Sequence, residues 1–234
     1  MSKKSGSSVF WISFSDLMTS LFFIVLVLFV VTYVDNVNKL RAKEEQLRVY
    51  REVEESLKPL KHDNDFFRYE EDYKRFLLAF DVKFAVAKAG INDSDLDNFN
   101  ETKVKIVHAG QKLKAVLDQI VIDASEQNEH QKNKVTYLVV ISGYASKLHN
   151  ADVSPVGMSA EYQLSYARAY SLWKFWLNQG INLEDPKYKG LIDLQIAGNG
   201  WGGVGRIKKD EEANQRFIVQ VVPKISNQEL TNLN

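Results

Sequence analysis

One carboxylate, that of Asp16, lies inside a long apolar stretch, FWISFSDLMTSLFFIVLVLFVV, which covers residues 10–31. An aspartate at the centre of a membrane helix costs roughly 2.5–3.5 kcal/mol on insertion scales, and such residues usually face protein or water and serve ions or protons. Ser13 and Ser20 lie three residues before and four after it, so they share its helix face, and Thr19 borders that face. The pattern predicts an ion-carrying Asp16 with pore-lining Ser13, Thr19 and Ser20. The alternative is that the Asp16 side chain extends to the cytoplasmic interface of the membrane and has no role in ion transport.

The element that must position Asp16 is a transmembrane helix over residues 10–34, which contains no other charged residue. About 20 apolar residues suffice to cross a bilayer. A cleaved signal peptide is the alternative, but it needs a shorter apolar region and a small-residue cleavage site, and no A-x-A pattern follows. Lys3 and Lys4 precede the span, so we expect residues 1–9 in the cytoplasm and the bulk of the chain outside. Because one helix cannot form an ion path, partners are expected: a second copy, a multi-span protein, or both.

The sequence of this helix resembles the transmembrane helix of MotB-type subunits of ion-driven motors. This group includes flagellar stators, the ExbD and TolR proteins, and the ZorB subunit of Zorya anti-phage systems. In these families one aspartate near the cytoplasmic end of the helix is essential, as Asp16 would be here. The similarity is greatest to the ZorB and MotB branches, in the motif aromatic-Trp-Ile-Ser-aromatic-x-Asp-Leu-Met-Thr. The resemblance implies a dimer of B subunits inside a ring of five MotA- or ZorA-like A subunits, a bacterial inner-membrane location, and proton or sodium passage through Asp16.

The composition and the remaining motifs give no support for several other classes of protein. The chain has 30 basic and 30 acidic residues, and the resulting zero net charge gives no reason to expect a nucleic-acid partner. It has no cysteine, hence no disulfide framework or thiolate metal site, and its four histidines show no metal-ligand spacing. The stretch GNGWGG, residues 198–203, fits a dinucleotide-binding pattern, but no long helix follows it, so we interpret it as a loop. We expect no enzymatic activity, no metal and no cofactor.

A charged helical linker is predicted over residues 35–75. Glycine is absent from residues 35–61, and the apolar spacing fits a short coiled coil or a solvated helix equally well. The remainder predicts an α/β sandwich over residues 76–224, followed by a tail over 225–234. Its expected strands are 76–84, 135–143, 191–200 and 216–222, its expected helices are 100–122 and 158–177, and residues 206–213 are expected to form a short helix or loop.

Residues 76–224 resemble the OmpA-like peptidoglycan-binding domain of the periplasm. LSYARAYSLWKFWLNQGI is similar to the family's Leu-Ser-x-x-Arg-Ala helix, VVISGYAS stands at its strand-to-turn motif, and NQRFIVQVV is similar to its Asn-Arg-Arg strand start. The resemblance implies that an arginine and an aspartate grip the diaminopimelate of the stem peptide, since a guanidinium pairs with a carboxylate. Here the turn aspartate is replaced by serine and the family asparagine by glutamate. The implied peptidoglycan-binding residues are Ser146, Glu161, Leu164, Ser165, Arg168, Asn214 and Arg216.

Two hypotheses of different kinds follow from these patterns. The first is a B subunit of an ion-driven inner-membrane motor, held by peptidoglycan. The resemblance of FWISFSDLMT and the lack of an amphipathic plug after the span favour a Zorya-type defence system over a flagellar stator. The second is a structural protein that ties the membrane to the wall, with the helix as a simple tether. Asp16 separates them, because a tether has no need of an acid in lipid.

Overall fold

The computed structural model describes residues 6–126, 133–147, 154–201, 206–207, 209–211 and 214–227. The chain divides into two compact units, Met1–Tyr50 and Arg51–Asn234. The first unit consists of helix α1, Gly6–Ser56, whose last residues belong to the second unit. Its stretch Phe10–Glu44 has a mean hydropathy of 2.6 over its most apolar window, and none of that window is buried within the protein. Of the residues described, this is the one helix long and apolar enough to cross a membrane.

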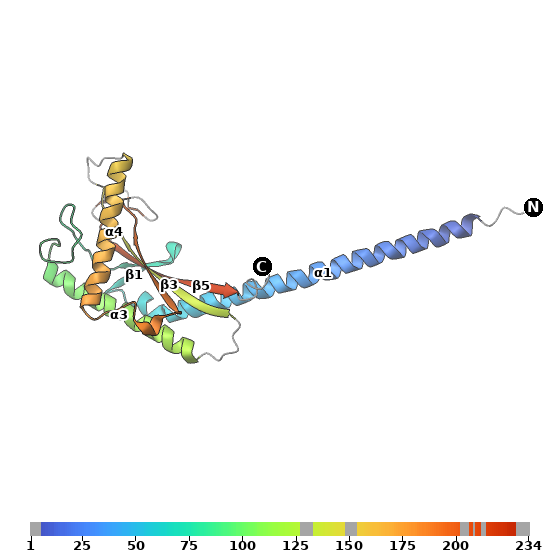
Figure 1. The fold of residues 1–234 in the computed structure, drawn as a ribbon, viewed down its shortest axis with the longest axis horizontal. Helices are drawn as coiled ribbons and strands as arrows, with labels where there is room; N and C mark the ends of the chain where they lie inside the picture. The colour runs from blue at the N-terminus through green and yellow to red at the C-terminus, as the bar shows by residue number, and fades with distance from the viewer. Residues whose placement is uncertain are drawn as a thin grey trace, which may run out of the picture. The chain divides into compact units, whose positions relative to one another are not determined.

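The second unit is built on a mixed five-stranded sheet (Figure 1). Its strands are β1 (Phe67–Glu70), β2 (Arg75–Leu78), β3 (Asn133–Gly143), β4 (Ile192–Gly198) and β5 (Phe217–Asn227). Their order in the sheet is β1-β2-β5-β3-β4, and only the β3–β4 pair is parallel. The helices of this unit are α2 (Lys58–Lys61), α3 (Phe99–Glu126) and α4 (Pro155–Asn178), with short 3-10 turns η1 (Glu71–Tyr73) and η2 (Pro186–Tyr188).

Helix α4 packs on one face of the sheet, at the ends of β3 and β4. A Cβ on Gly143 would lie 2.1 Å from the backbone oxygen of Ser165, and one on Gly198 would lie 2.5 Å from the backbone nitrogen of Tyr166. Glycine is therefore required at both strand ends for the helix to approach this closely. The buried Trp176 joins α4 to α3, because its Nε1 donates to the backbone oxygen of Ile106 at 2.8 Å.

Side chains alternate between the two faces of the sheet, as the pleat requires. Val139 and Ile141 share the face of Gly143 and are fully buried under the helical layer. Ser142 points to the opposite face, where its neighbour on β5 is Ile218 and the neighbour of Ile218 on β2 is Leu77. This second face carries a smaller buried cluster of Leu77, Tyr144 and Ile218.

The fold class expected from the sequence is confirmed: an N-terminal apolar helix is followed by helices and a mixed α/β sheet. The two main helices and the strands β3, β4 and β5 lie where the periodicity predicts them, with ends shifted by a few residues. Strand β5 continues to Asn227, into the range expected to be a tail, and residues 228–234 lie outside the described part of the chain, as do 208 and 212–213 of the expected segment 206–213.

The stretch before residue 76 differs from the helical linker expected there. Strand β1 lies within that range, and its Phe67 is fully buried while Arg68 and Glu70 alternate with it, so a short period-2 pattern is hidden among charged residues. The strand expected over 76–84 ends already at Leu78, and the chain continues as a loop in which Phe84 forms an isolated bridge with Leu96.

Candidate functional site

Four of the seven residues implied by the OmpA-like resemblance meet at one small cavity of about 70 Å³ in the second unit. Glu161, Leu164 and Arg168 come from α4, where spacings of three and four place them on one helix face. Ser146 comes from the segment after β3. The remaining wall consists of Phe84, Ala85, Val86, Ala87 and Gln215.

Arg168 is the buried centre of this site, with 3% of its surface exposed. Its Nε donates to the backbone oxygen of Lys88 at 3.0 Å, and its Nη1 donates to the backbone oxygen of Tyr144 at 3.1 Å. The Phe84 ring packs on the guanidinium, with 4.3 Å between the ring centroid and Cζ. Burial lowers the pKa of Arg168 to about 10, against the attraction of Glu161, so the group stays charged at neutral pH. Three of its five N–H groups remain for a ligand.

Glu161 supplies a carboxyl group at the same cavity. Its Oε2 is buried and has no hydrogen-bond partner among the described residues. Burial raises the pKa of Glu161, and the charge of Arg168 acts in the opposite direction. A buried polar atom without a partner is costly, so a ligand that donates a hydrogen bond here would gain affinity. Together the two side chains offer a cation and a carboxyl group, which suits the end of a molecule that carries both a carboxylate and an ammonium.

The other three implied residues do not line this cavity. Ser165 is fully buried, and its hydroxyl donates to the backbone oxygen of Tyr162 and accepts from the nitrogen of Gly200, both at 2.8 Å, so it fixes α4 against the loop after β4. Asn214 is also fully buried, and its amide bonds both the nitrogen and the oxygen of Ile207, which braces the loop before β5.

Arg216 packs its side chain on the Tyr144 ring instead, with 5.4 Å between Cζ and the ring centroid. It is 9% exposed, and burial lowers its pKa, while the negative charge of Glu70 acts in the opposite direction. The structure thus places Arg216 beside the polar groups of the second sheet face and apart from Arg168.

Sequence reasoning did not single out the segment from Phe84 to Lys88 or Gln215. The segment supplies the oxygen that holds Arg168, and its Ala87 has a φ of 56°, an uncommon conformation for a residue with a side chain. Gln215 joins the two walls, because its Oε1 accepts from the nitrogen of Phe84 at 3.1 Å and its Nε2 donates to Ser146 Oγ at 3.3 Å. Gln215 lies within the stretch compared with the family's Asn-Arg-Arg motif. The segment from Phe84 to Lys88 contains no sequence pattern that would indicate its role in the site.

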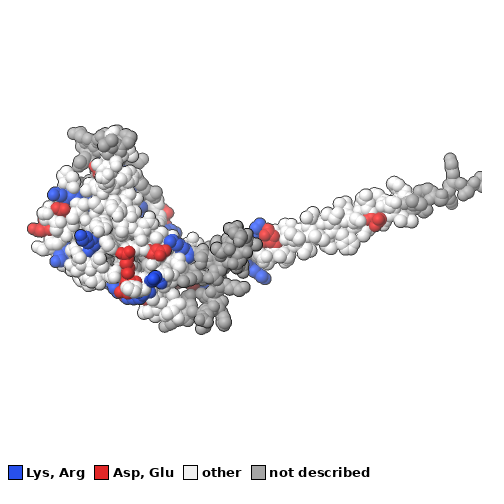
Figure 2. Space-filling view, viewed as in Figure 1, with Lys and Arg blue, Asp and Glu red and all other residues white. Residues whose placement is uncertain are grey.

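In the first unit, Ser13, Asp16, Thr19 and Ser20 all lie within the continuous helix α1. All four are exposed. The hydroxyl of Thr19 donates to the backbone oxygen of Ser15 at 2.8 Å, so its proton is already engaged within the helix. Apart from Asp16, no charged residue lies between Phe10 and Val34, and the corresponding part of the space-filling view is almost entirely white (Figure 2).

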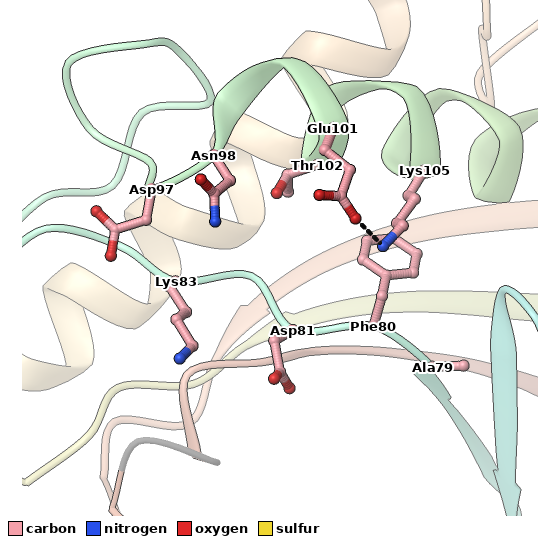
Figure 3. Close-up of a pocket in the computed structure, with 9 residues that line it drawn as sticks. All are labelled: Ala79, Phe80, Asp81, Lys83, Asp97, Asn98, Glu101, Thr102 and Lys105. Atoms are coloured by element: carbon pink, nitrogen blue, oxygen red, sulfur yellow. Dashed lines mark hydrogen bonds and ion pairs between the residues drawn. The ribbon is translucent and has the colours of Figure 1, made fainter.

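A larger cavity of about 420 Å³ lies beside the N-terminal end of α3 (Figure 3). It brings Asp81 and Lys83 of the loop after β2 together with Glu101 and Lys105 of α3. Lys105 is paired with Glu101 at 2.5 Å, and their side chains are 42% and 69% exposed. Exposed pairs of this kind contribute little and are well solvated. We therefore do not assign this cavity as the functional site.

No protein-family model and no curated protein matches the chain. Similar solved structures include the OmpA-like domain of FopA1 from Francisella tularensis subsp. tularensis SCHU S4, at 19% identity over 69% of this chain and 82% of that chain, with a TM-score of 0.33. A MotB-like protein from Desulfovibrio vulgaris is 12% identical over 76% and 94%, with a TM-score of 0.36. The periplasmic domain of Helicobacter pylori MotB is 10% identical over 72% and 93%, with a TM-score of 0.30. At these identities and scores the likeness carries no argument about activity.

Proposed function

We propose that the chain is the B subunit of an ion-driven motor of the bacterial inner membrane. The observation that carries the proposal is the single carboxylate of Asp16 within an apolar helix, on one face with Ser13 and Ser20. Acids within membrane helices commonly serve ions or protons, and Asp16 would take up a proton from one side of the membrane and release it on the other. The proton is preferred to sodium because the helix offers few additional oxygen ligands.

The second unit would hold the subunit to peptidoglycan from the periplasmic side. Arg168 would pair with the carboxylate of a diaminopimelate group and Glu161 with its ammonium, with Ser146 and Leu164 completing the cavity. Ser165 and Asn214 would act indirectly, through the backbone that they fix. We propose no enzymatic reaction for this site. The A subunits, in five copies around a B dimer, would carry the torque while the anchored B subunits resist rotation.

Within this class we propose a Zorya-type defence motor rather than a flagellar stator. The wording FWISFSDLMT around Asp16 supports this choice, as does the absence of an amphipathic plug from the evenly charged residues 35–50. Protection of cells against phage, measured as plaque numbers, and swimming motility separate the two roles directly. The second candidate function is a wall tether without ion transport.

The decisive experiment compares the wild type with Asp16→Asn, which keeps the shape and polarity but cannot carry a proton. A matched control is Asp35→Asn at the far end of the span, where the carboxylate is exposed and paired with Lys39 at 2.6 Å. We expect Asp16→Asn to abolish ion flux and biological activity while expression, membrane insertion and copurification with the A subunit persist. Asp35→Asn should keep all of them. Activity that survives Asp16→Asn would leave the tether as the better explanation.

Wall binding is tested separately by sedimentation of the full-length chain with purified peptidoglycan. Arg168→Gln removes the buried cation, and Lys174→Gln, at an exposed position of the same helix, removes an equal charge outside the cavity. Loss of one charge-assisted contact is expected to weaken binding at least tenfold. Equal binding by both variants and the wild type would remove the proposed role of Arg168.

A further inference from the structure

A third cavity, of about 480 Å³, lies on the sheet face opposite α4. Its floor is formed by Val140 and Ser142 of β3 and by Ile218 and Gln220 of β5, which are cross-strand neighbours. Its rim is formed by Tyr73, Arg75, Tyr144, Ala197 and Asn199. The volume lies in the range of small-molecule sites.

The buried polar group of this cavity is the guanidinium of Arg75, which is 5% exposed. Its Nε donates to Glu70 Oε2 at 2.6 Å, and its Nη1 donates to Tyr144 Oη at 3.1 Å. Its Nη2 is buried and has no hydrogen-bond partner among the residues described. A buried donor without a partner is unfavourable, so a ligand that accepts from it would remove that cost.

Further charged side chains lie near this group. Arg75 and Arg216 both lie near the Tyr144 ring, with 6.0 and 5.4 Å between the ring centroid and their Cζ atoms. Arg68 and Glu70 alternate with the buried Phe67 and the half-buried Tyr69 along β1, and they share the sheet face of Arg75. The carboxylate of Glu70 pairs with Arg75. Burial lowers the pKa of Arg216; the attraction of Glu70 opposes this effect, and the repulsion from Arg75 adds to it.

We propose that this cavity binds the oxyanion, a carboxylate or phosphate, of a small and otherwise uncharged molecule. The anion accepts from Arg75, and the neutral groups of Ser142, Asn199 and Gln220 contact the rest of the ligand. The Tyr73 ring packs on the Arg75 guanidinium, with 4.7 Å from its centroid to Cζ, and is 40% exposed. Binding includes a rotation of this exposed ring, which gives the anion access to Nη2. The site is separate from the Arg168 cavity and does not depend on peptidoglycan binding.

The test is calorimetric titration of the full-length chain in detergent at low ionic strength, with inorganic phosphate, acetate and the neutral control acetamide. We expect saturable binding of at least one anion and none of acetamide, and the anion that binds identifies the ligand class. Arg75→Gln should weaken binding about tenfold or more, because a charge-assisted contact is lost. Lys174→Gln, which removes an equal charge at an exposed position of α4, serves as the matched control and should leave binding unchanged.

Arg75→Gln leaves Glu70 without its cation and can destabilise the domain, so a second variant keeps the test decisive. Glu70→Gln removes the competing carboxylate while Arg75 stays in place, and it should tighten anion binding severalfold. The proposal is overturned if neither anion binds saturably to the wild type or to Glu70→Gln. It is overturned equally if folded Arg75→Gln binds anions as tightly as the wild type.

Discussion

Replacing Gly143 with alanine is expected to move α4 and so to damage the Arg168 cavity from a distance. The new Cβ would lie 2.1 Å from the backbone oxygen of Ser165 and 3.0 Å from the nitrogen of Ala169. Ordinary contact begins near 3.4 Å, so the helix or the strand must give by about 1.3 Å. Both close atoms belong to helix backbone, so no side-chain rotation relieves the clash.

The expected loss of stability is about 1–3 kcal/mol, as for other overpacked interiors. For a unit of this size, each kcal/mol corresponds to roughly 2–4 °C, so Tm should fall by about 2–12 °C. Arg168 is expected to lose its contacts as well, because its bonds of 3.0 and 3.1 Å to backbone oxygens do not survive a shift of that size. Thermal unfolding and peptidoglycan sedimentation of the full-length chain measure the two effects.

Gly180→Ala provides the matched control. Gly180 has a φ of 76°, and a Cβ there would meet nothing within 4 Å. The substitution therefore costs about 1–2 kcal/mol through backbone conformation alone and leaves α4 in contact with β3. We expect a similar fall in Tm with wall binding retained. Equal loss of peptidoglycan binding in both variants would show that binding depends only on stability. If Gly143→Ala keeps the Tm and the binding of the wild type, the argument from the close approach of α4 is refuted.

Three further predictions concern the core and pH. Burial would raise the pKa of Asp118, but hydrogen bonds from Lys114, Lys187 and Tyr188 outweigh it and lower the pKa from 3.8 to about 2. The resulting stability is present above pH 4 and lost as the pH falls towards 2, so Tyr188→Phe should cost about 1 kcal/mol in denaturant unfolding at pH 7 and less at pH 2. Trp176→Phe should cost about 2 kcal/mol, measured by urea unfolding, because it opens a cavity and removes the bond between α3 and α4. Ser165→Ala should cost about 1–3 kcal/mol, measured by thermal unfolding, since it leaves a buried N–H without its acceptor.

The long elements of the second unit could be predicted from the sequence because their patterns are local. Helix α4 repeats its buried positions over several turns, and β3 is a continuous β-rich run closed by Gly143. Strand β1 could not be found in this way, because four residues with two charges give too short a period-2 signal within a charged stretch. Its place in the sheet depends on pairing with β2, whose own pattern continues past the point where the strand ends.

In the candidate site, too, local sequence patterns predict some contacts, whereas contacts between distant segments could not be predicted. Glu161, Leu164 and Arg168 share one helix face, so helical spacing together with the Leu-Ser-x-x-Arg-Ala wording predicts their proximity. The oxygen of Lys88 could not be predicted, because it lies 80 residues away and acts through the backbone, which any residue type supplies. The roles of Gly143 and Gly198 could not be predicted either, because glycine is required there only by the close approach of α4, a distant segment of the chain.

These backbone contacts determine how the cavity would select a ligand. Arg168 is held by two carbonyl oxygens from segments that flank it and by the Phe84 ring, so its guanidinium is fixed before any ligand arrives. A fixed donor set loses little conformational entropy on binding, and it discriminates by geometry more than a mobile surface arginine would. A lysine at this position would keep the charge but could not bond both carbonyls and still present a planar pair of donors. The arginine is therefore required for its shape as much as for its charge.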